Sequence, residues 1–251
     1  MSLVTVENNG PVKTVTLNRP EKRNALNDEL LGELLAAFSE APGDEERVAV
    51  IRAAGPVFCS GMDLRQRKES LGKPASIVDS LRAIENYPLP VVAVVQGHAI
   101  AGGNEIALHC DFVVASSRAN FGMSLAQIGL APTWFLTKKL MEVCGPVGTR
   151  EILLLGDPVP ASRMLELGFI ARVAEPEALE DEAQKIIDRL AANAPLSLKI
   201  MKKTLVRQMA FRESTPYDDI DEEVRVVSAS EDAKEGVAAR VEKRAAEFKG
   251  Q

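Results

Sequence analysis

The clearest hydrophobic pattern of the chain is the run of five apolar residues from Val91 to Val95. An unbroken apolar run of this length predicts a strand that is buried on both faces. The chain then passes through small residues to the pair Gly102-Gly103, after which Ile106 and Cys110 have the spacing of one helical face. We therefore expect a buried strand that leads, through a glycine turn, into a helix.

Hydrophobic periodicity predicts further elements on both sides of this stretch. The expected strands cover 4–7, 12–17, 48–52 and 170–173, and the expected helices cover 28–38, 140–144, 149–155, 161–167, 181–190, 196–209 and parts of 216–248. Asn27 is expected to cap the first of these helices. A strand, a helix and another strand at this spacing indicate an α/β domain with parallel strands.

Composition narrows the class of protein. The chain has 251 residues, of which 46% are apolar and 26% charged, as in ordinary globular domains. Its formal net charge of −6 does not favour nucleic-acid or anionic-membrane partners. No apolar run approaches the ~18 residues of a membrane span. Cys59, Cys110 and Cys144 lack metal-ligand spacing, and without a signal-peptide pattern they predict reduced thiols, no metal site and a cytoplasmic location.

The glycine turn is the first candidate for chemistry. Gly102 and Gly103 would leave backbone N–H groups free at a helix start, where a carbonyl oxygen or an oxyanion can bind. Glu105 follows two residues later, and a carboxylate beside such donors suggests acyl chemistry. The alternative is that Glu105 only stabilises the helix N-terminus, as acidic residues often do there. The residues of this stretch alone leave both interpretations open.

Several motifs together resemble the enoyl-CoA hydratase/isomerase (crotonase) family. They are N-R-P-x-x-x-N-A-L at 18–26, F-C-S-G-M-D-L at 58–64, G-H-A-I-A-G-G-N-E at 97–105, F-G-M-S-L-A-Q-I-G-L at 121–130 and E-K-R-x-x-x-F-K at 242–249. The resemblance covers essentially the whole chain in the family's order. It implies a spiral of ββα units over residues 1–190 with the CoA and acyl site, and a helical trimerisation region over 191–251. It also implies a homotrimer or a dimer of trimers.

The resemblance assigns roles to individual residues. The N–H groups of Met62 and Gly102 would hold the thioester carbonyl of an acyl-CoA and stabilise the enolate that forms on it, while Glu105 would shuttle the proton. Coenzyme A would be part of the substrate, so no separate cofactor is expected. The residues that match substrate-binding positions are Arg23, Ala25, Ser60, Gly61, Asp63, Leu64, Arg65, Gly103, Leu125, Trp134, Phe248 and Lys249.

The acid–base groups depart from the family's hydratase pattern. Glu105 matches the first of two hydratase glutamates, but the position of the second is Leu125, and Thr133 occupies a place where some isomerases carry an acid. A single carboxylate can move a proton between carbon atoms, or assist decarboxylation or hydrolysis. The resemblance makes isomerisation or hydration of an enoyl-CoA the expected reaction. The alternatives are an acyl-CoA hydrolase, a decarboxylase, or a non-catalytic binder of acyl-CoA or RNA, although the net charge of −6 weighs against RNA.

The residues around Glu105 allow further hypotheses. An apolar surround that includes Leu125 and Trp134 would raise the pKa of Glu105 and make it a better shuttle near neutral pH. The alternative for Trp134 is ordinary core packing. His109 stands one helical turn after Glu105 and could form a hydrogen bond with it, or could be a structural residue only.

Overall fold

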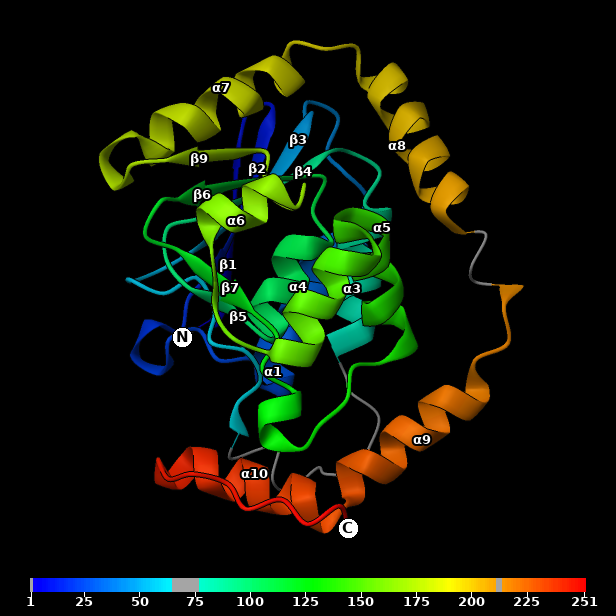
Figure 1. The fold of residues 1–251 in the computed structure, drawn as a ribbon. Coiled ribbons are helices and arrows are strands. Elements are labelled where there is room, and N and C mark those ends of the chain that lie inside the picture. Colours follow the sequence, from blue (N-terminus) through cyan, green and yellow to red (C-terminus); the bar gives the residue numbers. More distant parts are fainter. Residues whose placement is uncertain (1, 65–76, 211–213) are drawn as a thin grey trace.

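The computed structural model describes residues 2–64, 77–210 and 214–251 (Figure 1). Two sheets form its centre, a six-stranded sheet of order β1-β2-β3-β4-β6-β9 and a three-stranded sheet of order β5-β7-β8. The strands are β1 (Val4–Asn9), β2 (Val12–Leu17), β3 (Val48–Ala53), β4 (Val91–Val95), β5 (Ala99–Ile100), β6 (Phe112–Ser116), β7 (Asn120–Gly122), β8 (Val159–Pro160) and β9 (Arg172–Ala174). The main helices are α1 (Asp28–Ser39), α3 (Ile77–Asn86), α4 (Gly102–Leu108), α5 (Trp134–Arg150), α6 (Ala161–Glu166), α7 (Leu179–Ala191), α8 (Pro195–Met209), α9 (Asp218–Ala229) and α10 (Glu231–Glu242).

Successive turns of the chain follow one repeating path. β4 enters the large sheet, β5 enters the small sheet, and α4 follows; β6, β7 and α5 then repeat this order. In the preceding turn of the spiral, β3 is the strand of the large sheet. Cys59 occupies the small-sheet position of that turn, because it forms a parallel bridge with Ala99 of β5. This is the strand–strand–helix spiral that the sequence motifs imply, and it stacks equivalent turns of the chain beside one another. From β2 to β9 the large sheet is parallel, as the strand and helix spacing predicts.

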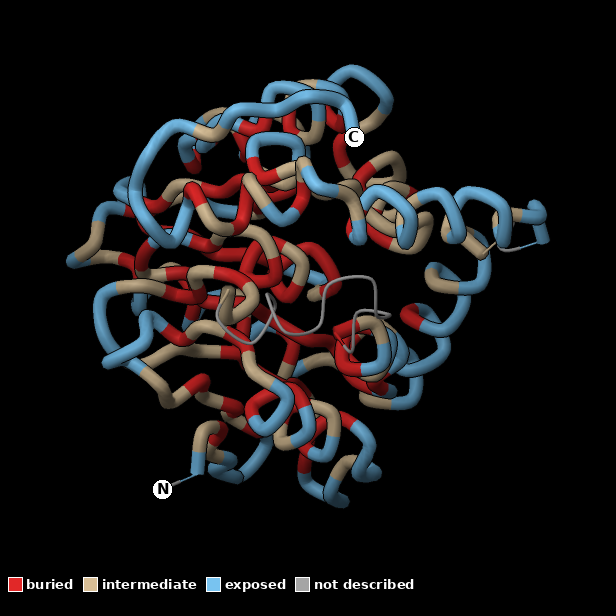
Figure 2. The backbone as a smooth tube through the Cα atoms, turned by 90° about the horizontal axis from the view of Figure 1, so that it is seen from below, coloured by how far each residue is buried: buried red, intermediate tan, exposed pale blue. Residues whose placement is uncertain are grey.

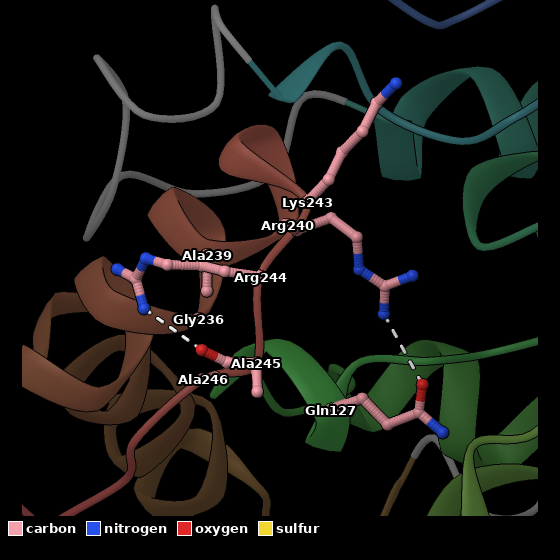
Figure 3. Close-up of a pocket in the computed structure, with 8 residues that line it drawn as sticks. All are labelled: Gln127, Gly236, Ala239, Arg240, Lys243, Arg244, Ala245 and Ala246. Carbon is pink, nitrogen blue, oxygen red and sulfur yellow. Dashed lines mark hydrogen bonds between the residues drawn. The ribbon is translucent and has the colours of Figure 1, made fainter.

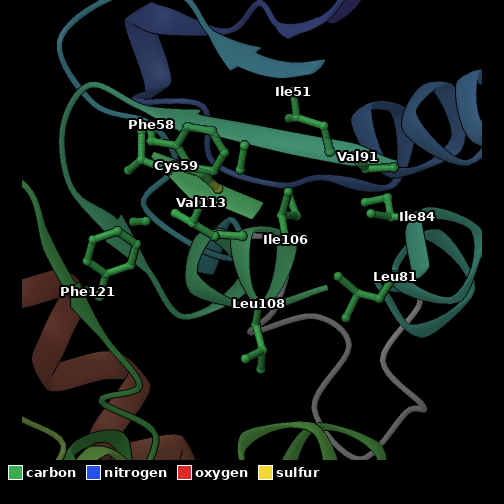
Figure 4. Packing of buried hydrophobic residues seen from close by; sticks show 14 of the residues in the cluster. Ile51, Phe58, Cys59, Leu81, Ile84, Val91, Ile106, Leu108, Val113 and Phe121 are labelled. Carbon is green, nitrogen blue, oxygen red and sulfur yellow. The ribbon is translucent and has the colours of Figure 1, made fainter. Parts of the chain in front are cut away.

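The predicted strand at Val91–Val95 is confirmed, and every residue in it is buried. It lies between two apolar layers. On one face, Ile106 of α4 faces β4, with Leu81 and Ile84 of α3 beside it (Figure 4). On the other face, α7 covers the alternate valines of the strands with Leu179, Ile187 and Leu190. Because both faces are covered, an unbroken apolar run suits this strand better than an alternating one.

The first predicted helix is also confirmed. The Asn27 side chain accepts a hydrogen bond from the Leu30 N–H at 3.0 Å, which caps α1 as expected. Buried residues are concentrated in the middle of the molecule, and exposed residues dominate the outlying C-terminal helices (Figure 2). Lys202 is 6% exposed and anchors α8, because its Nζ donates to Asp111 Oδ2 at 2.7 Å and to Leu89 O at 3.1 Å.

Some element boundaries differ from the expectation. α4 ends at Leu108, so Cys110 lies beyond the helix and is only partly buried. The predicted strand at 170–173 forms at Arg172–Ala174 instead. The expected helices at 140–144 and 149–155 belong to a longer path: α5 starts at Trp134, kinks at Gly145 and continues into a π-helical turn at Glu151–Leu155. Thr133 caps α5 by accepting from the Leu136 N–H at 3.3 Å, a Thr cap signal that periodicity alone does not reveal.

Candidate active site

The first glycine turn of the predicted site is held by strand-like contacts with Leu26. The Leu26 N–H donates to Gly61 O at 2.8 Å, and the Asp63 N–H donates to Leu26 O at 2.8 Å. These bonds form a parallel bridge between Leu26 and Met62. In such a bridge the N–H and C=O groups of Met62 point away from Leu26. Among the described residues, the Met62 N–H has no protein acceptor.

The second glycine turn precedes α4. Ala101 has a positive φ of 49°, a conformation that costs free energy in a residue with a β-carbon. Its N–H donates to Gly122 O of β7 at 2.8 Å, which ties the turn to the small sheet. Gly102 then begins the helix, and its N–H has no acceptor within the part of the chain that the structure describes. A free N–H is expected at the first position of a helix that no side chain caps.

The two glycine turns are in direct contact. A β-carbon built on Gly61 would lie 2.9 Å from Ala101 Cβ and 3.5 Å from Gly102 N. A β-carbon built on Gly102 would lie 3.7 Å from Gly61 Cα. The structure therefore brings together the segments that carry the Met62 and Gly102 amides, which the sequence places far apart. Two free N–H groups on adjacent turns are an arrangement that can bind one carbonyl oxygen.

Glu105 lies on the first turn of α4, and its N–H donates to Ala101 O at 2.9 Å. Burial raises the pKa of its carboxyl group to about 7. Desolvation is the cause of this shift, because no charged group contributes to it. A carboxyl group with such a pKa is divided between its acid and base forms near neutral pH, so it can take up a proton and give it back.

His109 does not bond to the carboxyl group of Glu105. Its Nδ1 lies 2.8 Å from the backbone oxygen of Glu105, and its ring stacks on Phe135 with 5.0 Å between centroids. Burial lowers the pKa of His109 to about 4, so the ring is neutral at pH 7. His109 therefore supports the end of α4 and its contact with α5, which agrees with the structural alternative.

Cys59 borders the same turn from the first glycine segment. Its Sγ accepts a hydrogen bond from the Gly61 N–H at 3.4 Å. Burial raises the pKa of the thiol to about 12, and the nearby Glu105 carboxylate adds to this effect, so the thiol stays protonated. A β-carbon on Gly103 would stand 2.4 Å from Cys59 O, so the helix start approaches Cys59 closely because Gly103 has no side chain.

The loops predicted to receive CoA are joined to each other. The Ser60 N–H donates to Arg23 O at 3.1 Å. Arg19 donates through Nη1 to Ala25 O at 2.9 Å and forms an ion pair with Asp63 at 3.0 Å. The Asp63 carboxylate therefore anchors the 18–26 loop through this ion pair. Leu64 follows as a partly buried residue, and Arg65 lies outside the described residues.

The residues predicted near the acyl end lie at the start of α5 and just before it. Leu125 is partly buried against the main core. The Trp134 N–H donates to Asp221 Oδ1 at 3.1 Å, and its ring stacks on Tyr217 with 5.5 Å between centroids and 5° between the planes. The C-terminal helices of the same chain therefore cover the start of α5.

Phe248 and Lys249 lie in the C-terminal tail of the chain. The tail after α10 folds back along that helix, and the Lys249 N–H donates to Asp232 Oδ1 at 2.7 Å. Phe248 is 45% exposed. A pocket of about 460 Å³ opens nearby between Gln127 and the end of α10, with Arg240 bonded to Gln127 at 3.4 Å (Figure 3). None of the predicted catalytic residues lines this pocket.

The described residues contain neither a metal-binding cluster nor a membrane-spanning helix. In residues 2–64, 77–210 and 214–251, no group of three or more His, Cys, Asp or Glu side chains is arranged to hold a metal ion. Within the same ranges, the structure contains no helix that combines the length and the apolar character needed to cross a membrane.

Comparison with known proteins decides the family. A family model described as enoyl-CoA hydratase/isomerase matches residues 7–251. The chain belongs to the enoyl-CoA hydratase/isomerase family. This confirms the resemblance seen in the motifs, and with it the enzymatic class.

Relatives within the enoyl-CoA hydratase/isomerase family carry different names. The chain is 32% identical over 248 residues to a short-chain-enoyl-CoA hydratase of Clostridium acetobutylicum, covering 96% of this chain and 95% of the relative. It is 31% identical over 249 residues to the 1,2-epoxyphenylacetyl-CoA isomerase of Escherichia coli, covering 95% of each. A solved methylmalonyl-CoA decarboxylase in complex with 2S-carboxypropyl-CoA has a TM-score of 0.90 and 28% identity, covering 99% of this chain and 98% of that one. The similarity to this solved structure confirms the crotonase fold.

Sequence reasoning about this family member missed two asparagines. Asn24 is fully buried, and its side chain holds the 18–26 loop by donating to Ala54 O and Val57 O, both at 2.9 Å. Its place inside N-R-P-x-x-x-N-A-L could have indicated this role. Asn104, beside Glu105, is also fully buried, and its amide has no hydrogen-bond partner in the described chain. Nothing in the sequence signals that difference.

Proposed function

We propose that this protein acts on an acyl-CoA thioester through an enolate. In this proposal the Met62 and Gly102 N–H groups bind the thioester oxygen, and Glu105 moves the proton at the carbon next to it. The observation that carries the proposal is the contact between the two glycine turns, with Glu105 on the same helical turn as Gly102. Fixed donors of this kind stabilise negative charge that develops on the oxygen, by about 3–4 kcal/mol per donor in comparable sites.

Isomerisation is the reaction that the single carboxylate supports best. Burial raises the pKa of Glu105, and no carboxylate among the described residues contributes to that shift. Leu125 occupies the position where family hydratases place their second glutamate. One carboxylate can take a proton from one carbon of an enoyl chain and return it to another, because the enolate stores the charge between the two steps.

Two other reactions of the family are second candidates. Hydration is favoured by the name of the Clostridium acetobutylicum relative, which is a hydratase. Decarboxylation is favoured by the structural similarity to methylmalonyl-CoA decarboxylase at a TM-score of 0.90. Both reactions pass through charge on the thioester oxygen, so the same two N–H groups would serve them. A non-catalytic acyl-CoA binder would also use the donors, but it would not need a proton shuttle.

We also propose a trimer, built on the 191–251 region. α8 carries four large apolar residues that are 58–78% exposed, at positions 196, 200, 201 and 205. Their spacing places them along one side of the helix, and an exposed apolar stripe of this kind suits contact with a second copy of the chain. The Phe248 and Lys249 positions would then be free to approach the CoA loops of their own or a neighbouring subunit. A cytoplasmic location is part of the same proposal.

The test is mass spectrometry of acyl-CoA esters incubated with the protein in D2O. The panel holds 2-enoyl, 3-enoyl, 3-hydroxyacyl and branched malonyl-type esters. We expect deuterium at the α or γ carbon of recovered enoyl esters without a gain of water. Gain of water, loss of CO2 or release of free CoA would name a different reaction, and binding without any exchange would indicate a non-catalytic protein.

Glu105→Gln provides the decisive variant for this test. We expect it to bind CoA esters as the wild type does and to lose exchange by about 10²–10⁴-fold, because the amide cannot accept the proton. Glu177→Gln, an exposed glutamate far along the chain, is the matched control and should exchange at the wild-type rate. Full exchange in Glu105→Gln would contradict the assigned role.

A further inference from the structure

The side chain of Asn104 is buried in an environment that does not satisfy it. The residue is 0% exposed, and neither Oδ1 nor Nδ2 has a hydrogen-bond partner among the residues that the structure describes. A buried amide without partners destabilises a fold, because it has lost its hydrogen bonds to water. Asn24 is buried to the same extent, yet its Oδ1 accepts from the Arg19 N–H at 2.8 Å and its Nδ2 donates twice. The missing partners of Asn104 therefore need an explanation of their own.

The first turn of α4 shows where this amide lies. Gly102 faces Leu26 and Ile77, whose side-chain carbons would stand 2.6 and 3.1 Å from an added β-carbon, and Gly103 faces Cys59. These two faces of the turn are filled by protein. The next two residues are Asn104 and Glu105, which lie about 100° apart around the helix. The amide thus occupies the helix face that adjoins the face of the candidate proton shuttle.

The chemistry of a carboxamide limits what can satisfy it. Its oxygen accepts hydrogen bonds, and its nitrogen donates them. A hydroxyl group or a water molecule can do both, because an O–H group donates through its hydrogen and accepts through its oxygen. A carboxylate could satisfy only the nitrogen, and a hydrocarbon chain could satisfy neither atom. An O–H group is therefore one complement of Asn104, and it is the one that a hydroxylated acyl chain or the solvent can supply.

We propose that Asn104 binds an O–H group beside Glu105, either the hydroxyl of a 3-hydroxyacyl-CoA thioester or a water molecule at the same place. The proposal rests on the proposed function, since it requires the acyl chain to pass Glu105. For a water that adds to an enoyl chain, the oxygen bonds to C3 while Glu105 takes a proton from it, and Glu105 then gives a proton to C2. Asn104 would hold that oxygen in position, which is a binding role and not a proton-transfer role.

Two ligands that differ by one hydroxyl group test whether Asn104 binds a hydroxyl group of the acyl chain. The dissociation constants of 3-hydroxybutyryl-CoA and butyryl-CoA are measured by calorimetry in Glu105→Gln and in Glu105→Gln with Asn104→Leu, since the first change suppresses turnover. Leucine has nearly the shape of asparagine without its polar atoms. We expect Asn104→Leu to raise the dissociation constant of 3-hydroxybutyryl-CoA at least 10-fold and to change that of butyryl-CoA less than 2-fold.

Isotopic oxygen tests the water source. Wild type and Asn104→Leu are incubated with crotonyl-CoA in H₂¹⁸O, and ¹⁸O at C3 is measured by mass spectrometry. If the O–H group is water, Asn104→Leu loses at least 10-fold in ¹⁸O incorporation while α-hydrogen exchange of butyryl-CoA in D2O continues. The α-hydrogen exchange measures the proposed function separately. If the wild type shows no exchange, the enolate mechanism is wrong. The role of Asn104 is then decided by the binding comparison between the hydroxy ester and the saturated ester.

Thermal stability separates a ligand-binding asparagine from a structural one. Asn104→Leu should have a wild-type or higher melting temperature, because it removes an unsatisfied amide and keeps the volume. Asn24→Leu, the matched control for stability, should melt at a clearly lower temperature, because its removal strands two carbonyl groups and one N–H group. If Asn104→Leu changes neither the preference for the hydroxy ester nor ¹⁸O incorporation, the proposal is wrong and Asn104 is a buried structural residue.

Discussion

The backbone of Gly61 lies against the amide nitrogen of Gly102, so that a β-carbon on Gly61 would stand 3.5 Å from that nitrogen and 3.0 Å from Ile100 O. Gly61 also has a φ of +92°, which residues with a β-carbon rarely adopt. The two N–H groups proposed to bind the thioester oxygen belong to Met62 and Gly102, on either side of this contact. Their relative position therefore depends on the absence of a side chain at Gly61.

Replacing Gly61 by alanine should lower activity even in the fraction of the protein that is folded. The added methyl group would lie 2.9 Å from Ala101 Cβ, so the segment around Gly61 and the segment around Gly102 must move apart. We expect Gly61→Ala to lower kcat for α-exchange by at least ~10²-fold, as the loss of one oxyanion donor does. It should also lower the free energy of unfolding in urea by about 1–3 kcal/mol, because of backbone strain.

Gly32→Ala is the matched control for that change. Gly32 lies in α1, where an added β-carbon meets nothing within 4 Å. We expect unchanged kcat and a free energy of unfolding higher by about 1 kcal/mol, because alanine favours a helix more than glycine does. A Gly61→Ala protein that folds and retains wild-type kcat would show that the contact does not position the donors.

The rate of proton transfer should depend on pH through Glu105. As the base, Glu105 must be ionised, and its buried carboxyl group has a pKa of about 7. We expect kcat/KM for α-exchange to rise about tenfold per pH unit well below pH 7 and to level off above it. The measurement is a pH profile in D2O with an acyl-CoA whose acyl group does not ionise. A profile that is already level at pH 5 would mean that the working base has an ordinary carboxyl pKa.

Stability should depend on the same ionisation in the opposite direction. The folded-state pKa of about 7 exceeds the ordinary value of 4.5, so the folded protein binds the proton more tightly than the unfolded chain does. This contribution to stability is fully present below pH 4.5 and is lost as the pH rises through 7. Because Glu105→Gln cannot ionise, its melting temperature relative to wild type should increase between pH 5 and pH 8. A difference that stays constant over this range would contradict the assigned shift.

A second carboxylate at position 125 should shift the reaction toward water addition. Leu125 is partly buried against the core. The motif resemblance matches it to the position of the second hydratase glutamate. We expect Leu125→Glu to raise the rate of crotonyl-CoA hydration by at least ~10-fold, since an added general acid–base group typically contributes 10²–10⁴-fold when well placed. Leu125→Gln has the same shape without the acid and should gain nothing. Equal gains in both variants would show that polarity, and not acid–base chemistry, limits hydration.

The sequence predicts best where short-range patterns are strong. The buried strand at Val91–Val95, the Asn27 cap of α1 and the parallel strands were all predicted from local spacing, because an unbroken apolar run, a capping residue and the alternation of strands with helices are visible in short stretches of sequence. The family motifs also placed Glu105 next to a glycine turn. Boundaries were harder to predict: α4 ends at Leu108, because contacts with other elements and not periodicity decide where a short helix stops.

Other features arise only when distant segments meet. The bridge between Leu26 and Met62, the contact of Gly61 with Gly102 and the ion pair of Arg19 with Asp63 join loops that local patterns cannot connect. Motifs could name the donors but could not show that their turns touch. The bond from His109 to the backbone oxygen of Glu105 could not be distinguished in sequence from a bond to its carboxyl group.

The sequence by itself therefore determined the α/β class and the family, and it singled out Glu105 as the candidate carboxylate. Tertiary structure decided the spiral of strand–strand–helix turns, which pairs residues far apart in the chain through backbone hydrogen bonds that carry no residue signature. It also confirmed the raised pKa that was expected for Glu105, and it decided that Asn104 has no hydrogen-bond partner among the described residues, while the Asn24 side chain is bonded through both of its polar atoms. Desolvation and hydrogen-bond satisfaction depend on everything that surrounds a group, and the sequence does not state those surroundings.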